Sequence, residues 1–416
     1  MTDVIIMFLS VPPLLVSCWY LLRGLLNTAV VIYPVFFLFY VSPSFLNVIY
    51  GVPVYPNKFD NLNAVNSDNS TVFIYGMFIS LLLVFFTYKL LKSKKTRLAV
   101  DSIVISSLVI RGLFILSISS LLLVLFAPNP EVYFDYGKIR SLYGTEDYKF
   151  YVYVSFSCVI SALCILILRF IHGENISNIK NLLFLTILIL DVVFNGKRLL
   201  MFFLPVYFMI GYFFSKNKKV DIIKVLVSFI IFISFYTYYT DEIKSDISKS
   251  EEQVYAALRI DFGRDDVLKF VINETLIKDG EILNYPGQTM FGAIVAYVPR
   301  SIFPNDEMKP YPYAQYLTNK LVYSERGAGL KGWTVTTSFI DELVSNFGWF
   351  GLLFVFLVYS KCFNYIDNLS SQNYRFYFYI VLAFLHVVHP HGIMPLVYLA
   401  FYLVMKSYFS GYKFKW

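Results

Sequence analysis

The sequence predicts an all-α protein that crosses a membrane many times. Hydrophobic residues make up 57% of the 416 residues and charged residues only 15%, whereas soluble domains carry about 25% charged residues. The mean hydropathy is +0.62. Apolar runs of about 20 residues recur along the chain, and this is the length that a helix needs to cross the hydrocarbon core of a bilayer. The short alternating strands that are typical of a membrane β-barrel are missing from the pattern.

About eleven apolar runs qualify as membrane spans. They lie near residues 4–22, 25–43, 72–91, 100–126, 149–170, 181–194, 199–215, 221–239, 337–360, 376–389 and 392–410. The chain then has three parts. Residues 1–239 form an N-terminal bundle of about eight spans, residues 240–336 a long polar loop with interfacial helices, and residues 337–416 about three closing spans.

Lysine and arginine are distributed unevenly between the two alternating sets of loops. One set carries Arg23, Lys89, Lys92, Lys94, Lys95, Arg97, Arg169, Lys180, Lys216, Lys218, Lys219, Lys224, Lys361, Arg375 and the C-terminal lysines. Cytoplasmic loops are enriched in these residues, so this set should face the cytoplasm. The long loop, residues about 240–335, and the turns at 195–198 and 389–392 should therefore lie together on the opposite side.

The termini and the cysteines add two expectations. The first apolar run has no basic residues before it and no small-residue cleavage site after it, so we expect a transmembrane segment and not a cleaved signal. Cys18, Cys158, Cys164 and Cys362 all fall within or at the ends of apolar runs, which argues against a disulfide framework. The net charge of +7 suits anionic lipid or phosphate, although basic cytoplasmic loops alone would produce it.

The long loop divides into three segments. Residues 241–282 alternate charged and apolar side chains, which predicts helices lying at the membrane surface. Residues 288–298 are apolar but too few to span, so we expect a helix half-sunk in the interface and stopped by Pro299. Residues 301–333 contain many prolines and glycines, which is typical of irregular backbone shaped for a ligand.

Six basic side chains on the outer side are candidates for binding a diphosphate. They are Lys197, Arg198, Arg300, Lys309, Arg326 and Lys331. The last four stand among prolines and glycines, where the backbone can approach a ligand closely, and the arginine fork matches two phosphate oxygens. The first two occupy a short outer turn where positive charge is disfavoured. Contact with lipid head groups is the alternative explanation for all six.

A polar stripe marks the helix that follows the loop. Thr334, Ser338, Asp341 or Glu342, and Ser345 recur at spacings of three and four residues, which places them on one helix face. A carboxylate there can act as a general base with a pKa raised by partial burial. Stabilisation of the helix N-terminus by Asp341 and Glu342 is the alternative.

Three histidines lie close together near the C-terminus, at His386, His389 and His391. Imidazole is the usual base near neutral pH, so His389 or His391 is a candidate base or substrate ligand. Their spacing matches no zinc signature, and we expect no metal. Histidines that are simply satisfied by packing are the alternative.

Residues 297–304, with the sequence YVPRSIFP, are followed by Lys309 and Pro310 and resemble the Wzy-type O-antigen or capsule repeat-unit polymerases. The resemblance continues through Gly327, Gly329, Thr336, Ser338 and Glu342 to the NFG triplet at 346–348 and Gly351. The basic turn at 196–198 has the position of a similar short motif in that family. Residues 305–308 make the gap between the two proline pairs wider than is usual in the family, and outside residues 285–351 and this turn only the general layout matches.

The resemblance implies a GT-C-like integral-membrane glycosyltransferase of the bacterial inner membrane whose active site faces the periplasm. It implies transfer of a growing glycan from undecaprenyl diphosphate to the non-reducing end of a lipid-linked repeat unit, without a cofactor. A Wzz-type chain-length regulator and a Wzx-type flippase are implied as partners beside the bilayer, and no nucleic acid is expected. The six basic residues would bind the diphosphate, and Glu342, Asp341, His389 or His391 would act as the base.

Two alternative functions remain open at this stage. An O-antigen ligase uses the same donor with a lipid A-core acceptor. A lipid-linked oligosaccharide flippase or other transporter usually places charges along a central path and contains repeats, whereas here most charge lies in one outer loop. The sequence has no Walker loop, G-x-S-x-G elbow or H-E-x-x-H motif, which argues against a nucleotide-driven pump, an α/β-hydrolase and a zinc protease.

Overall fold

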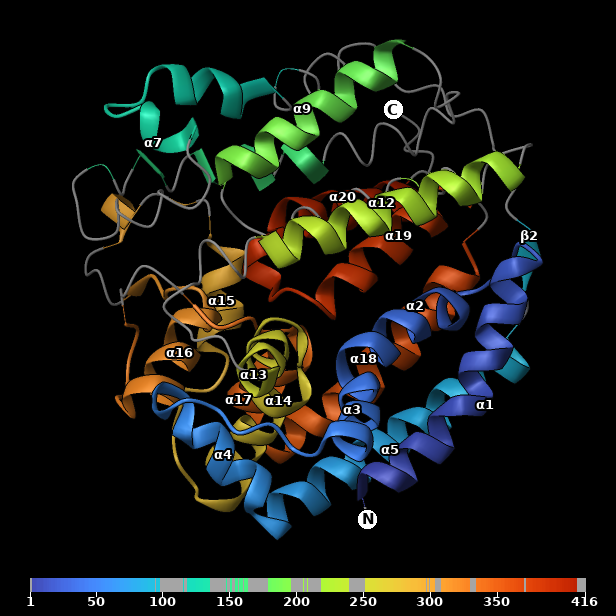
Figure 1. Ribbon diagram of the computed structural model, residues 1–416, viewed down its shortest axis with the longest axis vertical. Coiled ribbons are helices and arrows are strands. Elements are labelled where there is room, and N and C mark those ends of the chain that lie inside the picture. Colours follow the sequence, from blue (N-terminus) through green and yellow to red (C-terminus); the bar gives the residue numbers. More distant parts are fainter. Residues whose placement is uncertain are drawn as a thin grey trace. The chain divides into compact units, whose positions relative to one another are not determined.

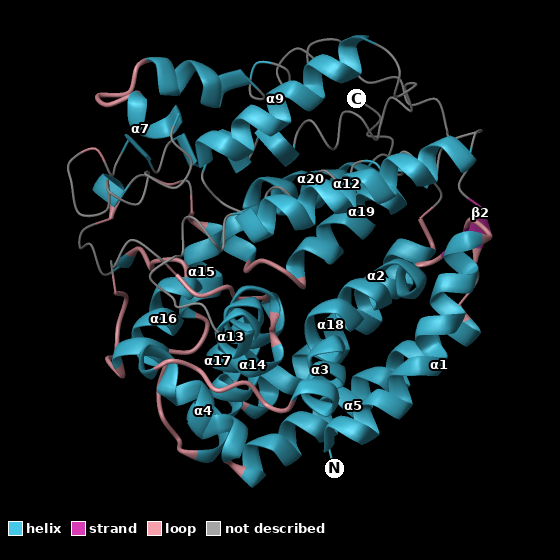
Figure 2. Ribbon diagram, in the orientation of Figure 1, coloured by secondary structure: helices cyan, strands magenta, loops and turns pink. Residues whose placement is uncertain are grey.

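The chain forms two compact helical units (Figure 1). Unit 1 comprises Met1–Arg97 and Lys249–Trp416, and unit 2 comprises Leu98–Ser248. The computed structural model describes residues 2–93, 95–97, 118–134, 179–195, 218–238, 251–296, 300–303, 308–329, 334–369 and 372–409, with shorter pieces at 115, 147, 150–151, 154–155, 157–159, 161–163, 205, 208 and 298. Within these ranges the elements are helices, apart from one antiparallel pairing of β1 (Leu25–Leu26) with β2 (Thr96–Arg97) (Figure 2).

Four helical segments of unit 1 are long and apolar enough to cross a bilayer. They are α1 (Thr2–Leu22), the continuous segment Thr28–Tyr50, α5 (Asn69–Lys92) and α18 (Trp349–Asp367). The second consists of α2 (Thr28–Phe36), a π-helical turn η1 (Phe37–Val41) and α3 (Ser42–Tyr50). These segments confirm a multi-pass helical membrane protein.

Shorter apolar helices overlap further predicted spans but do not reach the length of the four above. They occur at Leu183–Phe194 within α9 (Ile179–Asn195), at Ile222–Ser234 within α12 (Lys218–Tyr238) and at Tyr374–Leu385 within α19 (Gln372–Leu385). The last helix, α20, runs over Met394–Phe409. The expected spans at 100–126, 149–170 and 199–215 fall largely outside the described residues, so the count of about eleven stays a prediction.

Unit 2 has its own small core in the part that the structure describes. Tyr133 of α7 (Glu131–Phe134) and Phe194 of α9 pack with Val154 and Cys158. These residues are buried, with Val154 and Cys158 both at 0% exposure. The burial of Cys158 agrees with its position in an apolar run.

The predicted span at 337–360 is wrong in its first part, because two helices replace one. Helix α17 (Phe339–Phe347) ends at Gly348, whose backbone angles are φ 56 and ψ −131, and α18 begins at Trp349. A Cβ atom on Gly351 would lie 2.3 Å from the carbonyl oxygen of Leu343, so the absence of a side chain lets the two helices approach closely. The apolar pattern runs through this bend without interruption, and periodicity alone therefore does not reveal it.

The described residues of the long loop are mostly helical. It contains α13 (Glu251–Phe262), α14 (Asp265–Ile272), the π-helical turn η5 (Asn273–Ile277), α15 (Gln288–Ile294), the 3-10 turn η6 (Arg300–Ile302) and α16 (Tyr313–Tyr323). Helix α15 exposes Ile294, which is compatible with the half-sunk helix predicted there. Helix α14 differs from the surface helix that we expected, because all eight of its residues are buried.

An internal ion cluster explains how the charged α14 can be buried. The Arg259 guanidinium contacts the carboxylates of Asp265 and Asp266 at 2.6 and 2.7 Å, and the Lys269 ammonium contacts them at 3.1 and 3.2 Å. The two positive and two negative charges cancel, and a buried charge is tolerated only when an opposite charge lies beside it. Asn66 of α4 (Asp60–Ser67), which follows η2 (Asn57–Phe59), donates to Asp266 at 2.8 Å. The cluster therefore holds the loop helices against the N-terminal part of unit 1.

Candidate functional site

The first turn of α17 is built by Ser338 and Asp341. Ser338 has an extended backbone, its hydroxyl accepts from the Asp341 amide, and its own amide donates to Asp341 Oδ1 at 2.8 Å, which together form a capping box. The Ser338 hydroxyl also donates to that carboxylate and accepts from the Tyr40 hydroxyl at 2.5 Å. Asp341, one of the predicted catalytic carboxylates, is fully buried and holds the start of the helix.

Glu342 lies in a different environment, although it is the next residue. Its side chain is 0% exposed, and apart from the Thr289 hydroxyl no described group supplies its carboxyl oxygens with a hydrogen bond. Burial raises its pKa to about 8, an effect that the nearby Thr289 hydroxyl partly offsets. The Asn346 amide bridges the Glu342 carbonyl at 2.7 Å and Thr289 at 2.8 Å. Burial therefore favours the neutral acid, and the predicted role of Glu342 as the base stays a prediction.

Arg264 is the most unusual charged side chain near this helix. It is 0% exposed and sits in the bend between α13 and α14, where its amide donates to the Phe39 carbonyl at 3.0 Å. Its guanidinium donates to Thr336 Oγ1 at 2.6 Å and to the Val387 carbonyl at 2.9 Å. None of the described carboxylates forms an ion pair with it, and burial lowers its pKa while Tyr40, Asp341 and Asp261 act in the opposite direction.

Thr337, the residue after Thr336, also contacts the segment near the C-terminus that contains Val387 and His389. Thr337 Oγ1 lies 3.0 Å from Nδ1 of His389, the residue that precedes the 3-10 turn η8 (Pro390–Ile393). We name Arg264, Thr336, Thr337 and His389 the Arg264 assembly. It joins the long loop, the start of α17 and the turn that precedes α20. The sequence predicted that these segments lie on one side of a membrane, and within unit 1 they are in contact.

The other two histidines have different surroundings. The His386 Nδ1–H donates to the Leu382 carbonyl at 2.7 Å, because a carbonyl can only accept, and Nε2 therefore accepts from the Tyr359 hydroxyl at 2.6 Å. His386 is thus a buried packing histidine with a fixed tautomer. His391 is half-buried, and its ring centre lies 6.4 Å from that of His389.

The structure describes the side chains of two of the six basic residues predicted to bind a diphosphate. Arg326, about half exposed, forms a surface ion pair with Glu281. Lys309 donates to the carbonyls of Ala296 and Val298 at 2.8 and 2.5 Å, just beyond the end of α15, where a cation is favoured. Both side chains are therefore engaged with the protein.

The side chains of the remaining four basic residues lie outside the part of the chain that the structure describes. Arg300 opens the turn η6, but its side chain lies outside the described residues, as do Lys197, Arg198 and Lys331. A shared diphosphate pocket stays a prediction.

Sequence reasoning missed Arg264 and the ion cluster beside it. Residues 259–266 read RIDFGRDD, which we interpreted as part of a surface helix. The available signal was the charge balance around Gly263, where two arginines and Lys269 face three aspartates in the sequence, and where a Cβ atom would lie 2.7 Å from the Arg259 carbonyl oxygen. Balanced charges around a glycine indicate a tight, internally paired bend at least as well as a solvated face.

Among the described residues no cluster of three or more histidine, cysteine, aspartate or glutamate side chains is arranged to hold a metal ion. The site is a polar centre in which Arg264 and Thr337 are buried and Thr336 and His389 are half-buried. In comparisons with protein-family models, with curated proteins and with solved structures, none matches this chain.

Proposed function

We propose that the chain is a repeat-unit polysaccharide polymerase of the Wzy type. It transfers the growing glycan from undecaprenyl diphosphate to the non-reducing end of a lipid-linked repeat unit, at the periplasmic face of the bacterial inner membrane. The multi-pass helical structure and the sequence resemblance over residues 285–351 support this proposal. A Wzz-type chain-length regulator and a Wzx-type flippase are the partners that the proposal implies.

The observation that carries the proposal is the convergence of motif residues on the Arg264 assembly. Thr336 and Ser338, two residues of the motif, meet Arg264 and Tyr40 through hydrogen bonds. Between them, Thr337 contacts His389 on a turn that lies far along the sequence. The motif residues thus contact a buried guanidinium and a half-buried imidazole. These are groups that can bind an anion or transfer a proton, so the contacts support a catalytic role for the motif in addition to packing.

We assign His389 as the proton acceptor of the transfer. When Nδ1–H donates to Thr337, Nε2 is the basic nitrogen. The acceptor sugar hydroxyl attacks the anomeric carbon of the donor, the bond from that carbon to the diphosphate oxygen breaks, and the diphosphate leaves with the bonding electron pair. The hydroxyl proton passes to His389 Nε2. The basic residues Lys197, Arg198, Arg300, Arg326 and Lys331 are the proposed ligands of the leaving diphosphate.

Arg264 has a positioning role in this scheme. It contacts the Thr336 hydroxyl on one side and the Val387 carbonyl on the other, so it ties together the two segments that carry Thr337 and His389. Glu342 lies in the first turn of α17, close in sequence to Thr336 and Thr337, and burial favours its neutral form.

A deletion strain that is complemented with variants tests the proposal. Loss of a polymerase leaves lipid A-core capped by one repeat unit, and the wild-type gene restores the long-chain ladder on a gel. His389→Ala should not restore the ladder at normal membrane abundance, whereas Lys278→Ala, at an exposed side chain, should restore it. Bare core in the deletion strain would identify a ligase. Polymerisation of lipid-linked units by purified protein would exclude a transporter.

A further inference from the structure

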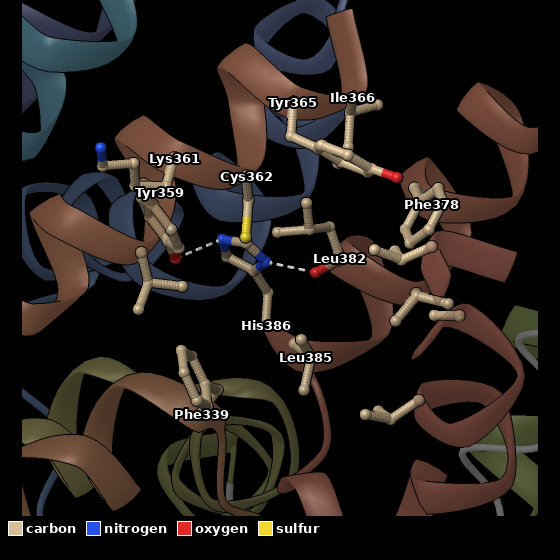
Figure 3. A pocket seen from close by; sticks show the side chains of 15 residues that line it. Phe339, Tyr359, Lys361, Cys362, Tyr365, Ile366, Phe378, Leu382, Leu385 and His386 are labelled. Carbon is tan, nitrogen blue, oxygen red and sulfur yellow. Dashed lines mark hydrogen bonds between the residues drawn. The ribbon is translucent and has the colours of Figure 1, made fainter. Parts of the chain in front are cut away.

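A cavity of about 330 Å³ lies among α18, α19 and α20, within the helices of unit 1 (Figure 3). Its walls are mainly aliphatic and aromatic, with Ile366, Phe378, Val381 and Ala400 among the lining residues. Figure 3 shows Phe339, the first residue of α17, across from Tyr365 and Ile366. The volume is at the lower end of the range of small-molecule sites.

Two of the polar groups that line this cavity, Tyr359 and His386, are engaged with each other and with the backbone. The Tyr359 hydroxyl donates to His386 Nε2 at 2.6 Å, and His386 Nδ1 is bound to the Leu382 carbonyl at 2.7 Å. A water molecule in a protein interior needs two to four polar partners. The walls offer little of this kind, so the cavity suits hydrocarbon better than water.

One cation stands at the rim. Lys361 lines the cavity with its stem, its side chain is exposed, and Figure 3 shows its ammonium directed away from His386. Lys361 lies inside the apolar helix α18 and forms no ion pair with a described residue. A lysine at such a position extends its ammonium to the level of lipid phosphates.

The charge pattern of the sequence decides which lipid is expected. Lysine and arginine counts predict that Lys361 faces the cytoplasmic side, whose leaflet is rich in anionic lipids. We propose that the cavity seats one acyl chain of an anionic phospholipid of the cytoplasmic leaflet, with the phosphate of that lipid paired to Lys361. The inference does not depend on the proposed polymerase activity, since the diphosphate of the carrier lipid belongs at the opposite face.

Native mass spectrometry of the purified full-length protein tests this proposal. The protein is first delipidated in detergent and then titrated with phosphatidylglycerol. We expect one tightly retained lipid, about fivefold weaker retention in Lys361→Gln from the loss of one cation, and loss of retention in Ala400→Trp, which fills the cavity. Lys92→Gln and Leu357→Trp change an exposed lysine and an exposed apolar residue that do not line the cavity, and both should behave as wild type.

Two outcomes would overturn the proposal. Equal retention by Ala400→Trp and wild type would show that the lipid sits elsewhere, and preferential retention of undecaprenyl phosphate over phosphatidylglycerol would assign the cavity to the carrier lipid. A second measurement applies if the tryptophan variant does not fold. Cys362 lines the cavity, so in a variant with Cys18, Cys158 and Cys164 changed to serine, phosphatidylglycerol should slow alkylation of Cys362. An unchanged alkylation rate would contradict the proposal.

Discussion

Thr337 Oγ1 and His389 Nδ1 lie 3.0 Å apart, although 52 residues separate them in the sequence. This contact connects the residue that precedes the cap of α17 to the turn that precedes α20. It fixes one ring nitrogen of His389 and so orients the other. The arrangement resembles the general pattern in which a base is held by a second polar group.

The first prediction concerns this contact. Thr337→Val has nearly the same shape but lacks the hydroxyl, and it should slow glycan transfer by about two- to tenfold, the value of one hydrogen bond. Thr337→Ser retains the hydroxyl and should recover most of the rate. The measurement is the initial rate of polymerisation by purified protein, with the thermal midpoint as a check on folding. Equal rates for the valine and serine variants would show that the contact does not orient the base.

The second prediction concerns Arg264. Arg264→Ala leaves the Thr336 hydroxyl and the Val387 carbonyl without their donor in a buried place, so it should lower the free energy of unfolding by about 3 kcal/mol or more. Arg326→Ala is the matched control, because the ion pair of Arg326 with Glu281 is exposed and is worth about 1 kcal/mol or less. Thermal or denaturant unfolding in detergent compares the two. If the two variants lost similar amounts of unfolding free energy, the hydrogen bonds of Arg264 would not be stabilising the fold as proposed.

The third prediction concerns pH. The pKa of Glu342 is about 8 in the folded protein and about 4.3 in an unfolded chain. The folded state thus keeps a proton that the unfolded state releases, so stability is full below about pH 4 and falls as pH rises toward 8, by a few kcal/mol in total. Glu342→Gln stays neutral and should lose this dependence.

The test is the thermal midpoint of wild type and Glu342→Gln between pH 5 and 9. Asp341, whose pKa burial raises to about 7, titrates in the same direction and leaves a smaller residual slope in the variant. The variant should be the more stable protein at pH 9. Equal slopes for the two proteins would show that Glu342 is not the buried neutral acid described here.

The fourth prediction concerns the diphosphate. If Arg300 and Arg326 bind it, the double variant Arg300→Ala/Arg326→Ala should raise the KM for the lipid-linked donor and shorten the glycan ladder while leaving the thermal midpoint nearly unchanged. Glu281→Ala, which frees Arg326 from its surface partner, is a useful comparison. If the double variant gave an unchanged glycan ladder, Arg300 and Arg326 would not be ligands of the diphosphate.

The sequence predicted two of the long apolar helices closely, because hydrophobicity is a local signal. The runs at 4–22 and 72–91 correspond to α1 and α5 within a few residues. The joined helices α17 and α18 were read as one span, since the apolar pattern continues through Gly348 and only the backbone conformation of that residue breaks the helix. The polar stripe on α17 was visible in advance, but its spacing does not show that Asp341 caps the helix while Glu342 lies neutral in the core.

By itself the sequence determined that this is a multi-pass helical membrane protein with one long polar loop, because hydrophobicity along the chain controls which segments can lie in lipid. Only the tertiary structure decided which polar groups meet. The burial of Arg264 and the contact of Thr337 with His389 depend on segments far apart in sequence, as do the hydrogen bonds of Asn47 and Asn66 to the cluster around Arg259. A buried charge is tolerated only where partners from other segments surround it, and local sequence carries no record of those partners.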